Sequence, residues 1–488
     1  MDRRVSGVAF AIGAALFASA HIGSSNAYFE GPAGPYPLRV IVRTPDVIPG
    51  LAQISVRVTD GPQPALVTVQ PLRWDAGLEG APPPDTARAV PGEAGLWAAE
   101  LWLMTTGSYG VRVGVAGDDG QGIAFVPVSA VAARRLDMNP LMAAVLVAAA
   151  LFLFVGGVTI FGAAVRESVL EPGQKPDRVR LRRGRIAMTL GGTALAAILW
   201  GGWSWWDEVD AAYRAGIFRP LSTTVTTGET DAGPTLTLVI DDPTWLGRQW
   251  TPLVPDHGKL MHMFLVREGD LAAFAHIHPE RLDSSTFVVP VPPMRSGRYL
   301  VYADIVQESG FTQTLIDTVS IEAWPGEGSV ESDGDDSWAE LPPFGQSTGE
   351  RFILPSGRGV LWETGARPRA DQEVSLGFRV TEPEGAPARL EPYIGMLSHA
   401  VVTRDDGSVF MHIHPAGSIN MAAQDMFRLA EAVPGGSIGR PAGARAAPPG
   451  SVSFPFVFPS GGSYRVVVQV KVDGAVETAA FDVDVPDA

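Results

Sequence analysis

The longest apolar stretches of the chain are two runs without a charged residue, at 141–165 and 186–206. Each is long enough to cross about 30 Å of hydrocarbon as an α-helix. The segment between them, 166–185, is basic and contains Arg166, Lys175, Arg178, Arg180, Arg182, Arg183 and Arg185. Positively charged connections between spans stay in the cytoplasm, so we expect a transmembrane hairpin with a basic cytoplasmic loop. Both flanking regions are then expected on the outer side, with the lipid bilayer as a partner.

The first twenty residues have the pattern of a secretory signal peptide. Arg3 and Arg4 precede an apolar run from Val5, and small residues end the segment at Ala20. Cleavage there would make His21 the first residue. Its terminal amine and imidazole would then form a copper chelate, unless a signal peptide is simply followed by a histidine. Export of the chain agrees with the orientation expected from the basic loop.

Outside these segments the chain alternates apolar and polar residues with a period of two, as strands with one buried face do. Clear examples begin at Leu38, Leu236 and Val374, one in each of three blocks. Blocks one, two and three cover 21–135, 220–323 and 350–488. An acidic stretch rich in glycine and serine, 324–349, separates the last two blocks and predicts a linker.

Each block also contains a late strand with the same opening, a glycine and then a tyrosine before alternating apolar residues. The tyrosines are Tyr109, Tyr299 and Tyr464. One such opening would mean little, but one per block predicts three related units. Units of about 100 residues with this pattern are typical of immunoglobulin-like sandwiches. We therefore expect a mostly β protein with three immunoglobulin-like β-sandwich domains and a two-helix transmembrane hairpin.

The composition removes several kinds of chemistry. The 488 residues include 0 Cys, which excludes disulfides, thiolate metal sites and cysteine nucleophiles. The formal net charge of −16 disfavours nucleic acid as a partner. A bound metal ion would therefore be held by histidine, methionine or carboxylate side chains.

Seven of the 8 histidines lie in blocks two and three, and six of them belong to one repeated frame: a histidine, an apolar strand, a charged turn, a second strand and then His-Ile-His-Pro. The histidines of this frame are His262, His276 and His278 in block two and His399, His412 and His414 in block three. His257 precedes the first copy on an expected loop. Two copies of one motif favour metal binding over the alternative, a pair of buried histidines that are hydrogen-bonded inside a sandwich. That alternative would be the first choice for a lone histidine.

The frame is that of a β-hairpin. In block three a two-residue turn at Asp406-Gly407 would place His399 opposite His414. In block two a three-residue loop at 269–271 would place His262 opposite His278. Residues two apart share a face, so His412 and His276 join their respective pairs. Three imidazoles so placed can converge on one ion, with His257 as a fourth ligand in block two.

Methionines flank these histidines with two different expectations. Met261, Met263 and Met411 have the opposite strand parity and are expected in the core. A second group, Met396, Met421 and Met426, lies near the block-three hairpin and could supply thioethers to Cu(I). The two hairpins could also face each other and share one cluster, which the sequence leaves open.

The segments LEPYIGMLSHAVVTRDDGSVFMHIHP and LMHMFLVREGDLAAFAHIHPE resemble a His-x-His-Pro β-sandwich module of bacterial exported proteins found beside copper and heavy-metal handling genes. LWAAELWLMTTGSYGVRVGVAG of block one resembles copper-resistance-type immunoglobulin-like domains. The resemblance implies copper, or zinc, bound by the six histidines of the two frames. It also implies location in the bacterial cytoplasmic membrane with the domains on the periplasmic side.

Three functions fit these observations. The first is a membrane-anchored metal-binding protein that buffers, senses or delivers copper to an acceptor protein. The second is a non-metal interaction or assembly factor of a membrane complex. The third is a histidine-ligated metalloenzyme, which is less expected because no nucleophile triad stands out and no acid lies at an obvious spacing to act as a base.

Overall fold

The structure is a computed structural model that describes residues 21–22, 26–171, 173–230, 233–246, 252–322, 333–365, 367–431 and 448–488. The chain divides into two units, one of residues 132–219 and one that joins 1–131 with 220–488. The predicted signal peptide, 1–20, lies outside the described residues.

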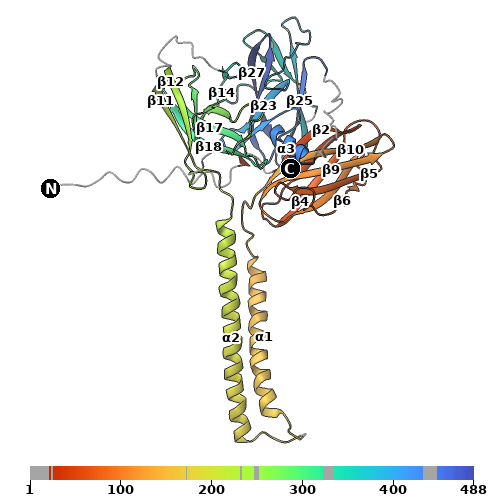
Figure 1. Ribbon diagram of the computed structural model, residues 1–488, viewed down its shortest axis with the longest axis vertical. Helices are drawn as coiled ribbons and strands as arrows, with labels where there is room; N and C mark the ends of the chain where they lie inside the picture. The colour runs from red at the N-terminus through yellow and green to blue at the C-terminus, as the bar shows by residue number, and fades with distance from the viewer. Residues whose placement is uncertain are drawn as a thin grey trace, which may run out of the picture. The chain divides into compact units, whose positions relative to one another are not determined.

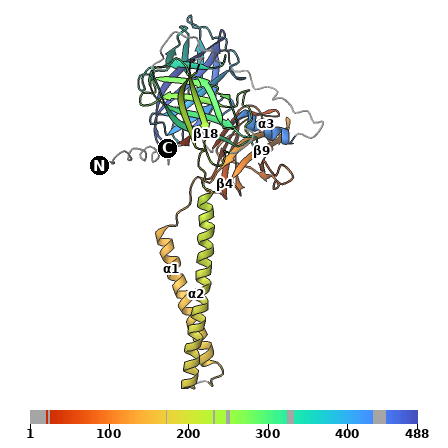
Figure 2. The ribbon, with the colours of Figure 1, turned by 60° about the vertical axis from the view of Figure 1, so that its left-hand side comes forward.

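The smaller unit is a pair of helices, α1 (Pro140–Glu167) and α2 (Arg178–Ala215), which run side by side in Figures 1 and 2. Both are long and apolar enough to cross a membrane by length and composition. Glycines let them approach closely. A Cβ on Gly162 would lie 2.5 Å from Cγ of Met188, and one on Gly191 2.5 Å from Cδ2 of Phe161. Small residues at such contacts are typical of helix pairs in membranes.

The basic segment is not the loop that the sequence predicted. Helix α2 begins at Arg178, and the Asp177 side chain accepts a hydrogen bond of 2.7 Å from the backbone N–H of Arg180. Most of the basic residues therefore lie on the first turns of the helix. This N-cap stabilises a helical start that the charge pattern alone did not indicate. At 1.5 Å per residue α2 is about 57 Å long, well beyond a hydrocarbon core of about 30 Å.

Block one is a sandwich of two antiparallel sheets. One sheet contains, in spatial order, β2 (Ala27–Ala33), β3 (Tyr36–Arg43), β4 (Gly50–Val58), β8 (Leu96–Leu103) and β7 (Arg88–Ala89). The other contains β10 (Gly120–Ala130), β9 (Gly107–Gly117), β5 (Leu66–Arg73) and β6 (Asp85–Thr86). Val40, Ile54 and Val113 are among the residues buried between the sheets, in agreement with the alternation seen in the sequence.

Block two repeats this architecture. One sheet contains β11 (Thr223–Thr230), β12 (Gly233–Ile240), β16 (Thr286–Pro290) and β15 (Glu280–Arg281). The other contains β18 (Thr312–Ile321), β17 (Gly297–Val306), β13 (His262–Arg267), β14 (Ala273–Ile277) and β19 (Ser337–Glu340). The prediction of a linker at 324–349 is wrong for its second half. Strand β19 lies there and pairs with β14 as the edge strand of this sheet.

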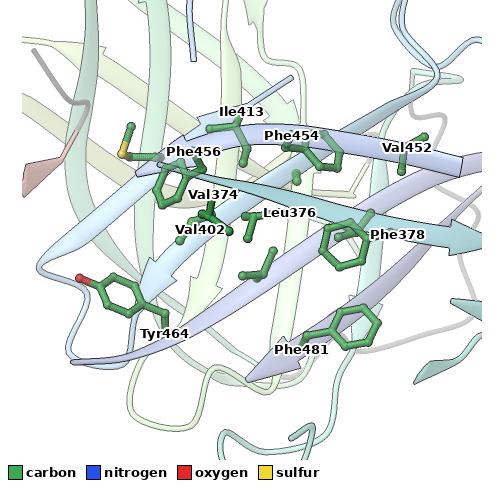
Figure 3. Close-up of a cluster of buried hydrophobic side chains, with 14 of the residues drawn as sticks. Val374, Leu376, Phe378, Val402, Ile413, Val452, Phe454, Phe456, Tyr464 and Phe481 are labelled. Atoms are coloured by element: carbon green, nitrogen blue, oxygen red, sulfur yellow. The ribbon is translucent and has the colours of Figure 1, made fainter. Parts of the chain in front are cut away.

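Block three has the same two layers. One sheet contains β20 (Arg351–Ile353), β21 (Gly359–Trp362), β22 (Glu373–Thr381) and β25 (Ser451–Val457). The other contains β1 (His21–Ile22), β24 (Val409–Ile413), β23 (Ser398–Arg404), β26 (Gly462–Val472) and β27 (Ala475–Val485). Figure 3 shows Phe378, Phe454 and Phe481 among the apolar side chains of its core. Strand β1, expected in block one, instead pairs in parallel with β24 of block three.

The repeated Gly-x-Tyr opening has one structural role in all three blocks. The glycines that open these strands have positive φ angles, 136° at Gly107, 157° at Gly297 and 151° at Gly462. The hydroxyl of Tyr299 donates to the carbonyl of Arg295 at 2.7 Å, and that of Tyr464 to the carbonyl of Ser460 at 2.8 Å. In block one the hydroxyl of Tyr109 accepts a hydrogen bond from the backbone N–H of Thr105, also four residues earlier. The three units therefore share a tyrosine corner, as immunoglobulin-like domains do.

Blocks two and three pack sheet against sheet. The outer face of β13 and β14 buries Phe264 and Phe274 against Val401 and Phe410 of block three. The ring of Phe410 also stacks on Tyr302 at 3.9 Å between centroids. The hydrophobic residues of this face exclude water from the interface, which decides the environment of the histidines beside them.

A helix that the sequence analysis missed, α3 (Met421–Glu431), joins block three to block one. Figures 1 and 2 show it against the strands of block one near β9. Phe427 packs with Leu72 and Phe125, and the Gln424 amide donates to the carbonyl of Phe125 at 2.6 Å. The three blocks therefore form one unit.

Candidate metal centre

Both histidine hairpins have the predicted register. The ladder of β13 and β14 pairs Met263 with Ile277 and Phe264 with His276, so His262 is level with His278. In block three, the ladder of β23 and β24 pairs Ala400 with Ile413, which brings His399 level with His414. The block-two trio (His262, His276 and His278) and the block-three trio (His399, His412 and His414) therefore stand on equivalent hairpins.

The turns are longer than predicted. In block three the strands end at Arg404 and resume at Val409, with a hydrogen bond of 3.0 Å from the Gly407 N–H to the Arg404 carbonyl. In block two the loop covers 268–272, and Leu271 adopts a positive φ of 49°. The expected pairs next to each turn do not form, because these residues follow turn geometry instead. The register is unchanged, since each strand is shortened by the same number of residues.

Strand parity separates the methionines from the histidines as expected. Met261, Met263 and Met411 are buried in the cores of their own sandwiches. Met421 and Met426 lie on α3 and Met396 lies in the turn before β23, and all three are half-buried. A thioether contribution from this second group stays a prediction.

The two trios meet at the interface between blocks two and three. The ring of His412 lies 5.6 Å, between centroids, from the rings of both His262 and His276. His276 also lies 6.0 Å from His399. Within the trios the corresponding distances are 4.4 to 5.4 Å. The six imidazoles therefore form one continuous cluster, the arrangement that the sequence had left open.

Each trio has metal-binding spacing. In each, one nitrogen from every ring lies within 4.8 Å of the others. Five of the six residues are at least 95% buried, and the His412 side chain is 5% exposed. An ion at this place would be held away from bulk water.

Each block orients a ligand of the other block. The Nδ1 atom of His276 lies 3.0 Å from Oε1 of Gln469, a residue of β26 in block three. Reciprocally, Nδ1 of His412 lies 3.3 Å from a carboxylate oxygen of Asp304 on β17 of block two. Gln469 pairs with His399 in its sheet as Asp304 pairs with His262, so the two contacts are equivalent under the repeat.

The hydrogen bonds of the block-two trio fix where its protons lie. His262 Nε2 is 3.2 Å from the carbonyl oxygen of Asp256, so this nitrogen carries the proton. The Gln469 amide nitrogen donates to Ser337, which turns its oxygen toward His276. His276 Nδ1 therefore carries the proton, and the second nitrogens of His262 and His276 are left with lone pairs.

The block-three trio repeats this assignment with different partners. His399 Nε2 is 3.0 Å from the carbonyl oxygen of Tyr393 and donates to it. Nδ1 of His412 lies 3.3 Å from a carboxylate oxygen of Asp304, which favours a proton on this nitrogen. Nδ1 of His399 is left with a lone pair, and Nε2 of His412 has one as well when the proton of its ring lies on Nδ1.

The nitrogens that this assignment leaves without a proton face each other in pairs. The distance from His262 Nδ1 to His276 Nε2 is 3.1 Å, and that from His399 Nδ1 to His412 Nε2 is also 3.1 Å. Burial lowers the pKa of His262, His276 and His399 well below the ordinary value, so the rings stay neutral. Two neutral acceptors at this distance repel, whereas a cation about 2.0–2.1 Å from both nitrogens fits the spacing.

The third histidine of each trio has unpartnered nitrogens. His278 Nδ1 lies 2.8 Å from a carboxylate oxygen of Asp336, and its Nε2 has no hydrogen-bond partner among the described residues. A carboxylate behind a histidine is a common way to orient a metal ligand. Neither nitrogen of His414 has a partner in the described part of the chain. Buried polar nitrogens without partners are costly, which makes both positions candidates for ligation.

His257 was predicted to join the block-two trio, but it lies beside the block-three trio. Its ring is 5.4 Å from His414 and 5.9 Å from His399, so it faces block three rather than its own hairpin. A positive φ of 51° turns it across the interface. The absence of a side chain at Gly395 makes room for the His257 ring, because a Cβ there would lie 3.3 Å from its Nδ1 atom. Local sequence could not predict this crossing, because it depends on how the sandwiches pack.

The sequence pattern did not predict the polar partners of the trios, although one signal for them was present. Asp304 and Gln469 each stand seven residues after the glycine of the repeated opening, between apolar neighbours in the strand. A polar residue recurring at the same place of a repeat indicates a shared site. Asp336 and Ser337 gave no comparable signal, because they belong to a stretch with the composition of a linker.

The backbone of His21 lies opposite Val409 on β24. The register places it on the turn side of that strand, away from the end that carries His414. Its side chain lies outside the described residues, so copper binding at this position stays a prediction.

Comparisons with known proteins add little to this geometry. Residues 356–487 match the model of a domain of unknown function (DUF8832), which includes the block-three trio. No curated protein has a significantly similar sequence. The remaining similarities are to solved structures.

A tetra-tandem repeat from the extending region of a large adhesion protein is 10% identical, with 91% of this chain and 72% of that chain covered and a TM-score of 0.15. The FN1–FN3 domains of chicken CNTN1 are 10% identical, with 94% and 99% covered and a TM-score of 0.14. Escherichia coli alpha-2-macroglobulin is 11% identical, with 95% and 44% covered and a TM-score of 0.19. Scores this low carry no argument about function.

Proposed function

We propose that this protein is a membrane-anchored, extracytoplasmic copper-binding protein whose two histidine trios hold metal at the interface of blocks two and three. The observation that carries the proposal is the pair of 3.1 Å contacts between imidazole nitrogens, which the outer partners of the four rings favour as unprotonated. A bound cation removes this repulsion, and no other group among the described residues lies between the rings in either contact.

The ligand chemistry favours copper. Neutral imidazole binds Cu(II) and Zn(II) well, and Cu(II) stands above Zn(II) in the general order of affinities. With 0 Cys in the chain, zinc has none of the thiolates that most structural zinc sites use. The resemblance of both hairpins to modules beside copper-handling genes supports the same choice, with zinc as the competing ion.

The helical pair and its charges support the proposed location. Helix α2 has basic residues at its start and the acidic Asp207, Glu208 and Asp210 near its other end. This asymmetry of charge favours a cytoplasmic position for the 168–177 connection. All three sandwiches then lie outside the cytoplasmic membrane. A buried site of this kind suits retention of copper, as in buffering or in delivery to a specific acceptor protein.

The decisive experiment is metal analysis of the full chain in detergent after loading with Cu(II) and removal of excess ion. The expected stoichiometry is two copper ions per chain. The double variant His276→Ala/His278→Ala should retain one, because two ligands of one trio are lost. A matched control is Thr381→Val, since this buried hydroxyl lies in the core layer of block three, away from the histidines.

Two results would contradict the proposal. One is a wild-type protein that stays free of copper and zinc after loading. The other is an unchanged stoichiometry in the double variant. A folded, metal-free protein with the same secondary structure by circular dichroism would instead support a non-metal role in the assembly of a membrane complex.

A further inference from the structure

A polar pocket of about 90 Å³ opens beside the block-three trio. It lies between β17 and β18 of block two and the segment that follows the second hairpin. Its polar lining includes Asp304, Gln313, Thr314, His412, His414 and Asn420. The volume is sufficient for a few water molecules or for an ion of two or three atoms.

The walls of this pocket offer groups that have no partner within the protein. Both nitrogens of the buried His414 are unpartnered in the described chain, as is the side-chain amide nitrogen of Gln313. Asp304 is already engaged, because it accepts a hydrogen bond of 2.6 Å from the Thr314 hydroxyl and lies against His412. The pocket is therefore lined by both a hydrogen-bond donor and a metal ligand that have no partner among the described residues.

The block-two trio has different surroundings. Asp336 accepts hydrogen bonds from both the backbone N–H and Nδ1 of His278, at 2.9 and 2.8 Å. The Tyr393 hydroxyl and Gln469 both contact Nδ1 of His276, at 3.1 and 3.0 Å. None of the three block-two histidines lines the 90 Å³ pocket. The same hairpin thus stands in a closed setting in one block and an open one in the other.

We infer that the copper held by the block-three trio keeps one coordination position open to this pocket and binds a small anion there, with the Gln313 amide donating to it. This inference rests on the proposed function. The class of ligand is set by three facts: a volume that admits only a few atoms, a metal cation at one end and an N–H donor at the other.

Azide is a suitable probe because it is a three-atom anion whose binding to Cu(II) gives a new charge-transfer absorption. The full chain is loaded with copper, its stoichiometry is measured, and azide is titrated. The block-three variant His412→Ala/His414→Ala should lose the absorption, while the block-two variant His276→Ala/His278→Ala should keep it. Gln313→Leu should weaken azide binding about threefold to tenfold, the loss of one hydrogen bond. Ser320→Ala, at the exposed far end of the same strand, is the control.

The outcomes separate this inference from the proposed function. Two bound copper ions without any azide absorption would overturn the open position and leave copper binding intact. An absorption that survives in the block-three variant, or that Gln313→Leu leaves unchanged, would overturn it too. A chain that binds no copper would end both proposals.

Discussion

The two histidine trios are built on the same hairpin but completed by different neighbours. In block two, Asp336 stands behind His278 and comes from the acidic stretch after the sandwich. In block three, the corresponding His414 has no hydrogen-bonded carboxylate among the described residues and instead lies in a group with His257 and Asp256 of the other block. The strands determine which imidazoles converge, and the packing of the sandwiches determines what surrounds them.

Neither block contains a complete site. Gln469 of block three orients His276, and Asp304 of block two orients His412. Metal affinity should therefore depend on the contact between blocks as well as on the ligands. Variants in one trio should therefore be compared with matched variants in the other.

The largest effect is expected from the double variant His412→Ala/His414→Ala. It should lose one of two copper ions per chain, the mirror image of the block-two variant, because each trio loses two of three ligands. Elemental analysis measures the result. Loss of both ions in either variant would mean that the cluster holds a single shared ion rather than two.

The variant Asp336→Asn should weaken copper binding at the block-two trio by about tenfold to a hundredfold, because it removes the charge that orients His278. Competition with a copper chelator measures the affinity of each site. The matched control is Asp335→Asn, whose side chain pairs with Lys471 at 3.1 Å instead of with a histidine. An equal loss in both variants would show that the effect is general charge loss.

The metal-free protein should become less stable in acid. Burial lowers the pKa of His262, His276, His399 and His414 in the folded state, so the unfolded chain binds protons first. The stability from each neutral ring is fully present above the unfolded pKa of about 6.5 and is lost as the pH falls below it, by about tenfold in the folding equilibrium per pH unit.

Denaturant titrations between pH 7.5 and 5 measure this slope. The variants His276→Gln and His399→Gln, one in each trio, should each reduce the slope of stability against pH by the contribution of one titrating ring. A slope that only one of the two variants reduces would show that the trios are protonated differently in the fold.

The smallest effect is expected from His257→Ala. Because the ring completes the block-three trio without being held by its hairpin, its removal should weaken copper binding there by about threefold and leave the block-two site unchanged. The same chelator competition resolves the two sites. A loss confined to the block-two site would restore the assignment suggested by the sequence order.

Local patterns predicted the parts of this molecule that depend on neighbouring residues in the chain. The apolar spans, the alternating strands and the tyrosine openings all have a direct physical signature. The hairpin register was predictable because strand parity and the position of a turn fix it. The parity of Met263 against His262 followed from the same rule.

The remaining features depend on packing between distant segments. The crossing of His257, the strand at 337–340 and helix α3 gain their stability from contacts that composition does not reveal. Asp336 illustrates the limit, since an aspartate in a Gly-Ser-Asp stretch has the same local signature whether it is solvated or lies against a buried imidazole.

The position of Gln469 on β26 has a consequence for how the centre is made. This strand follows all of the histidines in the sequence, and it supplies the amide that sets the proton of His276. If the chain is exported and binds copper as we propose, a chain whose last histidine has crossed the membrane would carry every ligand of both trios without the group that prepares them. Copper acquisition is then expected late in biogenesis, after the final sandwich strands have arrived.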